Sequence, residues 1–87
     1  MHANKTKVKR LLNTAKGQIE GIINMIDNDK YCVEISNQIL ASIAILKKVN
    51  IEILEAHLQH CVVNASTYEE RLEKMEEVSD ILKKVSK

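Results

Sequence analysis

The run CVEISNQILASIAILKKVNIEILEAHLQHCVV, residues 32–63, sets the architecture of the chain because it contains neither glycine nor proline. Apolar side chains recur along it at steps of three and four residues, which is typical of one face of an α-helix. That face comprises Ile35, Ile39, Ile43, Leu46, Ile53, Leu54, His57 and Cys61. About 30 residues at ~1.5 Å each make a rod of ~45 Å, whereas a compact 100-residue domain has a radius of gyration of only ~13 Å. We therefore expect an obligate oligomer, in which a second copy covers this helix.

Shorter helical patterns flank the rod on both sides. The preceding one starts after Asn4, a residue type that caps helix N-termini, and ends in a polar turn at residues 27–30. The following one opens with Thr67 and Glu70, which have the spacing of a capping box. We predict a single all-α domain over residues 1–87 with helices at about residues 4–27, 32–63 and 67–86.

The composition excludes several classes of protein. The chain of 87 residues is 45% hydrophobic and 29% charged, a globular balance, and it has no apolar run of the ~18 residues that a membrane span needs. The basic N-terminus continues into an amphipathic pattern, so we expect no secretory signal and a cytoplasmic protein. In that compartment two cysteines indicate free thiols, metal ligands or redox groups. The chain has no glycine-rich phosphate loop and too few residues to enclose a substrate pocket, so we expect no enzyme.

Positive charge is concentrated near the N-terminus, although the net charge of the chain is only +1. Residues 1–19 carry five cations and no acid, so residues 20–87 sum to −4. The five are Lys5, Lys7, Lys9, Arg10 and Lys16. A solvated helix end accounts for this cluster in one chain, whereas several copies presenting it on one face would bind phosphates. Lys47 and Lys48 would extend such a surface.

Three residues have the chemistry of a soft metal site. His57 and Cys61 are four residues apart and share a helix face. Cys32 starts the same helix, over ~40 Å from Cys61, so a shared site needs a second, antiparallel chain. Two thiolates and one imidazole favour Cu(I) over structural zinc, which prefers four ligands. We expect neither His60, which lies ~100° around the helix from Cys61, nor the terminal His2 to ligate the metal. Without a second chain, His57 and Cys61 are ordinary packing residues.

Several stretches together resemble the copper-sensing operon repressors of the CsoR/RcnR family of bacterial transcriptional regulators. They are GQIEGI at residues 17–22, YC at 31–32, QI at 38–39 and EAHLQHCV at 55–62. The Cys, His, Cys set at spacings of 25 and 4 matches the copper-sensing branch. Nickel- and cobalt-sensing relatives have His where Cys61 stands, formaldehyde-sensing relatives lack that thiol, and persulfide-sensing relatives lack the histidine.

The resemblance implies an assembly, a ligand set and a DNA-binding activity. The family forms an antiparallel dimer with a four-helix core, and two dimers form a homotetramer. Cu(I) is expected between Cys32 of one chain and His57 with Cys61 of the other, next to a supporting pair, Tyr31 and Glu77, that couples the metal to DNA binding. The copper-free protein is expected to repress transcription by binding operator DNA, and copper to release it. Taken alone, Tyr31 is an ordinary residue at a helix start and Glu77 a solvated carboxylate.

The first helix departs from the family pattern at the residues that contact DNA. Leu11 and Thr14 stand where the family usually has arginine, and Lys16 where an acidic residue is common. Arginine makes bidentate contacts with phosphate or guanine that leucine and threonine cannot make. Charge is supplied instead by the candidate DNA contacts Lys5, Lys9, Arg10, Lys16 and Lys48.

Two other functions remain open at this stage. One is a repressor that senses persulfide or oxidation by bridging Cys32 and Cys61 of facing chains. The other is a copper-buffering helical bundle that does not bind DNA. This function stays open because Leu11 and Thr14 stand where the family usually has arginine.

Overall fold

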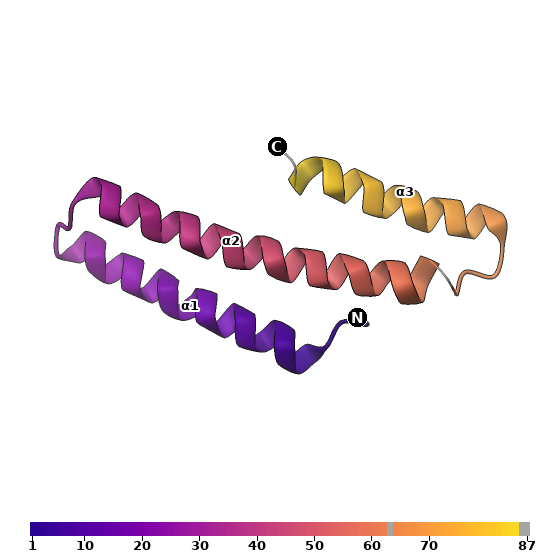
Figure 1. The fold of residues 1–87 in the computed structure, drawn as a ribbon, viewed down its shortest axis with the longest axis horizontal. Coiled ribbons are helices and arrows are strands. Elements are labelled where there is room, and N and C mark those ends of the chain that lie inside the picture. Colours follow the sequence, from indigo (N-terminus) through magenta and orange to yellow (C-terminus); the bar gives the residue numbers. More distant parts are fainter. Residues whose placement is uncertain (63, 86–87) are drawn as a thin grey trace. The chain divides into compact units, whose positions relative to one another are not determined.

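The structure is a computed structural model that describes residues 1–62 and 64–85, except for the side chains of residues 61 and 62. Three α-helices follow one another along the chain: α1 (Lys5–Asp27), α2 (Cys32–His57) and α3 (Tyr68–Val85) (Figure 1). One turn of π-helix, η1 (Leu58–Val62), continues directly from α2. The described residues contain no strand, so the prediction of an all-α chain with a long central helix is confirmed.

The end of the central helix differs from the prediction of one α-helix over residues 32–63. The α-helix stops at His57, and Leu58–Val62 follow with the wider i→i+5 geometry. Apolar spacing does not distinguish the two forms over a single turn, because both keep the chain helical. Residue 63 lies outside the described residues. Turns of π-helix are frequent at functional sites.

Both predicted N-terminal caps are present. The side chain of Asn4 accepts a hydrogen bond of 3.1 Å from the backbone N–H of Lys7, and α1 begins at the next residue. The hydroxyl of Thr67 accepts one of 3.0 Å from the backbone N–H of Glu70. Each cap satisfies one of the backbone donors that a helix leaves unpaired at its start.

The C-terminal end of α1 closes in a Schellman motif. The backbone N–H of Asp29 donates to the carbonyl of Ile26 at 3.1 Å, and that of Lys30 donates to Met25 at 3.0 Å. Asp29 adopts the left-handed conformation with φ of 53°, which aspartate tolerates better than most side chains. The polar turn predicted at residues 27–30 thus ends α1 and redirects the chain into α2.

The chain forms two units, of which the first is Asn4–Val49. In it, α1 lies antiparallel to the first part of α2 (Figure 1). The buried Ser42 donates a hydrogen bond of 3.0 Å to the side-chain oxygen of Gln18 across the two helices. The apolar core of this unit consists of Val8, Ala15, Ile22 and Val49.

The second unit comprises Met1–Ala3 and Asn50–Lys87. Within it α3 turns back and contacts η1 (Figure 1). The buried apolar residues here are Leu54, Ala65 and Val78.

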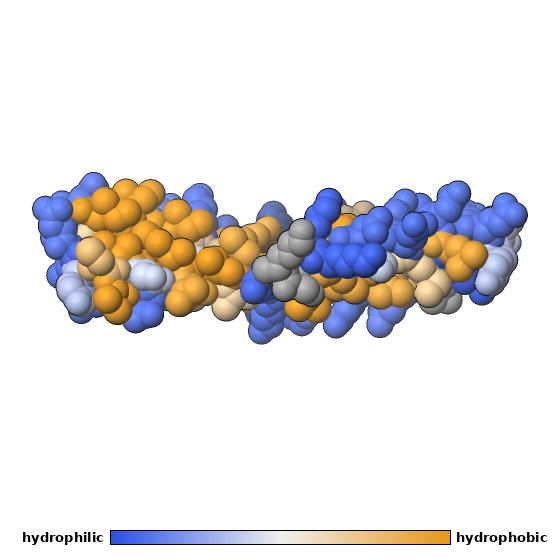
Figure 2. Space-filling model, turned by 90° about the horizontal axis from the view of Figure 1, so that it is seen from above, coloured by the Kyte–Doolittle hydropathy of each residue, from blue (hydrophilic) through white to orange (hydrophobic). Residues whose placement is uncertain are grey.

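Many large apolar side chains of the described residues remain exposed. In the Asn4–Val49 unit the exposed aliphatic side chains, which we call the exposed apolar surface, are Leu12, Ile19, Ile23, Ile26, Val33, Ile39, Leu40, Ile43 and Leu46. Figure 2 shows apolar side chains gathered over the end of the α1–α2 hairpin. Exposed apolar patches of this kind mark surfaces that contact a partner. None of the described helices is long and apolar enough to cross a membrane.

At the start of α3, Ser66 in the preceding loop and Glu70 in the first turn of the helix form an interaction that depends on pH. The hydroxyl of Ser66 donates to a carboxylate oxygen of Glu70 at 2.7 Å, and the backbone N–H of Ser66 donates to the same oxygen at 3.2 Å. These bonds, the hydroxyl first, hold the pKa of Glu70 below its ordinary value of 4.5. A lowered folded-state pKa stabilises the fold above the unfolded pKa, and this contribution is lost as pH falls through the folded pKa.

We predict that Ser66→Ala raises the pKa of Glu70 toward its ordinary value, because the stronger of the two hydrogen bonds is removed. An NMR titration that follows the side-chain carboxyl carbon of Glu70 measures this shift. Ser79→Ala, at an exposed serine on the same helix, is the matched control and should leave the titration unchanged. An unchanged Glu70 titration in Ser66→Ala would contradict the assignment.

Candidate metal site and basic groove

His57 and Glu77, two residues singled out from the sequence, lie together in the second unit. His57 is the last residue of α2, and its Nε2 lies 3.8 Å from Oε2 of Glu77 on α3. This is longer than a hydrogen bond but within reach of an ion pair. The side chain of His57 is 30% exposed and that of Glu77 59%. With Nε2 facing the carboxylate, Nδ1 is the ring nitrogen left for a further partner.

Cys32 and Tyr31 lie at the other end of α2. Cys32 is the first residue of the helix and an exposed free thiol. Tyr31 is also exposed, and its carbonyl accepts a hydrogen bond of 3.2 Å from the backbone N–H of Ile35. Because α2 is continuous, Cys32 and His57 are separated by the whole length of the helix.

Cys61 belongs to η1, but its side chain lies outside the described residues. Elsewhere in the described part of the chain, no three His, Cys, Asp or Glu side chains cluster as a metal site. The set Cys32, His57 and Cys61 therefore stays a prediction for a site that one chain does not assemble.

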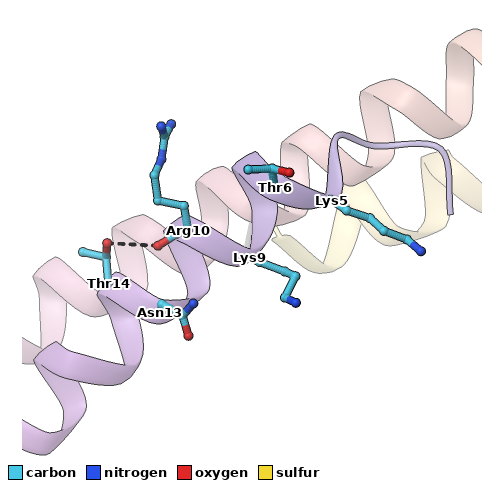
Figure 3. A pocket seen from close by; sticks show the side chains of 6 residues that line it. All are labelled: Lys5, Thr6, Lys9, Arg10, Asn13 and Thr14. Carbon is cyan, nitrogen blue, oxygen red and sulfur yellow. Dashed lines mark hydrogen bonds between the residues drawn. The ribbon is translucent and has the colours of Figure 1, made fainter.

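A basic groove runs along the first turns of α1. It is an open depression lined by Lys5, Thr6, Lys9, Arg10, Asn13 and Thr14 (Figure 3). The lining carries three cations and no acid, and Figure 3 shows the long side chains of Lys5, Lys9 and Arg10 extending away from the helix. The hydroxyl of Thr14 donates to the carbonyl of Arg10 at 3.1 Å, so it is bonded to the backbone of its own helix. Such a surface suits an anionic backbone.

The groove contains some of the candidate DNA contacts and not others. Lys5, Lys9 and Arg10 line it, whereas Lys16 and Lys48 are exposed outside it. Thr6 and Asn13 line it too and were not predicted, although residues three and four apart from Lys9 and Arg10 share their helix face.

The two positions at which the arginine of the family pattern is absent lie in different surroundings. Thr14 lines the groove, but Leu11 is half-buried and does not. The absence of an arginine at position 14 therefore falls within the groove, whereas the absence at position 11 falls outside it.

The chain is similar to known metal-responsive regulators over nearly its whole length. The family model described as a metal-sensitive transcriptional repressor matches residues 4–84. The copper-sensing transcriptional repressor CsoR of Bacillus subtilis (strain 168) is 39% identical over 83 residues, which cover 95% of this chain and 82% of that protein. The copper-sensing transcriptional repressor RicR of Mycobacterium tuberculosis (strain H37Rv) is 39% identical over 61 residues, covering 70% of this chain and 64% of that protein.

A solved structure is similar in fold. The crystal structure of the copper-sensing repressor CsoR with Cu(I) from Geobacillus thermodenitrificans NG80-2 has a TM-score of 0.84 and 29% sequence identity to this chain. The match covers all of this chain and 94% of that one.

Proposed function

The chain belongs to the family of metal-sensitive transcriptional repressors, and we propose that it is a Cu(I)-responsive member that binds operator DNA without copper and leaves it on binding copper. The observation that supports copper most directly is the set Cys32, His57 and Cys61, in a chain similar to named copper-sensing repressors over 95% of its length. In this proposal the protein acts in the cytoplasm on DNA and is not an enzyme.

The donor set fits Cu(I) chemically. Thiolates are soft ligands that select Cu(I), and imidazole completes a low-coordinate site. His57 meets a further requirement, because a ligating imidazole is oriented by an oxygen acceptor on its other nitrogen. The carboxylate of Glu77, 3.8 Å from Nε2 of His57, is positioned for that role and leaves Nδ1 for the metal. Tyr31, adjacent to Cys32, is the second residue proposed to support the ligands.

The site requires two chains. Cys32 and His57 are the first and last residues of a 26-residue helix, which at ~1.5 Å per residue spans roughly 39 Å. Two antiparallel copies of α2 bring Cys32 of one next to His57 and Cys61 of the other. The exposed apolar surface supports the association, since burial of its leucines and isoleucines removes apolar area from water, which favours a dimer. Pairing of two dimers then gives the proposed homotetramer.

The basic groove is the proposed contact with the DNA backbone. Each cation that neutralises a phosphate releases a condensed counterion, so affinity falls as salt rises. One groove offers Lys5, Lys9 and Arg10, and Lys16 and Lys48 add charge outside it. A tetramer multiplies this set fourfold.

Copper and DNA binding are coupled by a free energy. A hundredfold loss of DNA affinity on copper binding corresponds to ~2.7 kcal/mol of coupling, and DNA must weaken copper binding by the same factor. In this proposal Glu77 and Tyr31 transmit the coupling between copper binding and DNA binding, because each lies beside a proposed copper ligand. Glu77 on α3 lies near His57, and Tyr31 directly precedes Cys32.

We predict that Cys32→Ser and Cys61→Ser each abolish the response to copper while the copper-free proteins still bind DNA. Fluorescence anisotropy of reduced protein on DNA from upstream of its own gene, with and without one Cu(I) per chain, measures both properties. The unsubstituted protein should lose about a hundredfold in affinity, and Ser79→Ala should behave like it. A full copper response in either cysteine variant would refute the ligand assignment. Mass spectrometry after exposure to peroxide, alone or together with sulfide, tests thiol sensing, because peroxide supplies the two-electron oxidation that a cross-link requires. A cross-link between Cys32 and Cys61 would favour that function.

We predict that Arg10→Ala weakens DNA binding and makes the slope of log affinity against log salt shallower by about 0.9 for each phosphate that is no longer neutralised. Thr14→Arg should tighten binding and steepen the slope by a similar amount, because it restores a cation inside the groove. Lys83→Ala on α3 removes the same charge elsewhere and is the matched control. If Lys83→Ala weakens binding as much as Arg10→Ala, net charge and not the groove determines affinity. Copper uptake without DNA binding would instead favour the copper-buffering bundle.

We predict that Ile43→Glu dissociates the oligomer, because burial of an unpaired carboxylate costs several kcal/mol. Analytical ultracentrifugation at several concentrations measures the change. Asn37→Glu introduces the same side chain about 120° around α2, at an exposed polar residue, and should leave the mass unchanged. An Ile43→Glu protein of unchanged mass would show that the exposed apolar surface is not the interface.

A further inference from the structure

His2 and His60, which no pattern in the sequence pairs, lie against each other in the second unit. Their ring centroids are 5.0 Å apart and their planes differ by 20°. Both residues are exposed. We propose that His2 and His60 form a two-imidazole site for a borderline divalent cation of the class of Cu(II), Ni(II) and Zn(II), additional to the proposed Cu(I) site.

The separation of the rings fits joint coordination. A metal–imidazole bond is ~2.0–2.1 Å long, which puts the ring centre roughly 3.2 Å from the metal. Two such rings at 90–109° around one ion then have centres roughly 4.5–5.2 Å apart, given that bond length. The observed 5.0 Å lies in this range. Because the rings are stacked with planes only 20° apart, each exposed ring has to turn by tens of degrees about its Cβ–Cγ bond before one nitrogen of each points at a common ion, a rotation that leaves the ring centres nearly in place.

The donor type determines the class of ion. Imidazole suits Cu(II), Ni(II) and Zn(II), whereas Cu(I) prefers thiolates, and among the divalent ions Cu(II) binds most tightly. Among the described residues no third His, Cys, Asp or Glu side chain completes a larger cluster, so the described side chains supply two ligands. We therefore expect a site weaker than the thiolate set, and one that responds to a different oxidation state of copper.

His57 does not take part in this site. It precedes His60 by three residues, but its Nε2 faces Glu77, whereas the ring of His60 lies against His2. The same short segment thus presents one imidazole to a carboxylate and another to the chain before α1. An ion held by His2 and His60 ties Met1–Ala3 to η1, and the next residue, Asn4, caps α1.

The test uses the full chain with Cys32→Ser and Cys61→Ser, which removes the thiols that would reduce or bind the probe. Cu(II) is titrated in, and electron paramagnetic resonance reports nitrogen ligation and stoichiometry. We expect one Cu(II) per chain, with affinity lowered at least tenfold by His2→Ala and by His60→Ala, each added to that background. His57→Ala is the matched control and should change the affinity less than threefold, while circular dichroism verifies that each variant is folded.

Two outcomes would overturn the proposal. Binding that survives His60→Ala would assign Cu(II) to the N-terminal segment alone, and an equal loss in His57→Ala would assign it to the end of α2. Because the background lacks both thiols, the result does not depend on the proposed Cu(I) response. That response is tested separately in the protein with its cysteines.

Discussion

A continuous α-helix keeps its two ends apart, and most of the chemistry proposed for this protein follows from what its longest helix has at each end. Cys32 opens α2 and His57 closes it. No rearrangement of loops brings them together, because the intervening backbone is hydrogen-bonded throughout. A site that uses both residues has to be assembled between chains, so metal affinity and association become parts of one equilibrium. In the proposed repressor, Cu(I) is therefore bound at the interface between two chains.

The thin core of the chain is consistent with that dependence. Among the described residues no large side chain is fully buried, and isoleucines and leucines of both α1 and α2 are exposed. A short chain without phenylalanine or tryptophan has few ways to bury enough area by itself. In the proposed dimer, association supplies that burial, and the same contact aligns the helices that carry the proposed ligands. The exposed apolar surface would then contribute both to the stability of the dimer and to the assembly of the metal site.

Helical periodicity and capping residues predicted the fold well. Asn4 and Thr67 were identified as caps from residue type and spacing alone, because capping is a local interaction. The π-turn at Leu58–Val62 was not predicted, since one turn of wider helix leaves no separate pattern of apolar residues. The capping box also differs in detail, because Glu70 reaches Ser66, one residue before the expected partner.

Contacts between distant segments were predictable only through the family resemblance, or not at all. The approach of Glu77 to His57 was expected from the resemblance and not from spacing. The stacking of His2 on His60 was not expected, because it depends on where the chain before α1 lies. The groove residues Thr6 and Asn13 are an intermediate case. Their spacing from Arg10 would have identified them, had polar uncharged side chains been considered alongside the cations.

The hydrogen bond between Ser42 and Gln18 sets the axial alignment of the two helices in the Asn4–Val49 unit. Two helices that pack only through apolar side chains can shift along each other by one turn, because each leucine contact is then replaced by a similar one. A single polar pair in such a seam does not, since a slip leaves a buried hydroxyl and an amide unsatisfied. Single buried polar residues specify register in coiled coils for this reason. Here a slip of one turn, about 5.4 Å, would move every cation of α1 relative to Lys48. An uncharged pair between the helices thus sets the spacing of the positive charges that a DNA backbone would meet in the proposed complex.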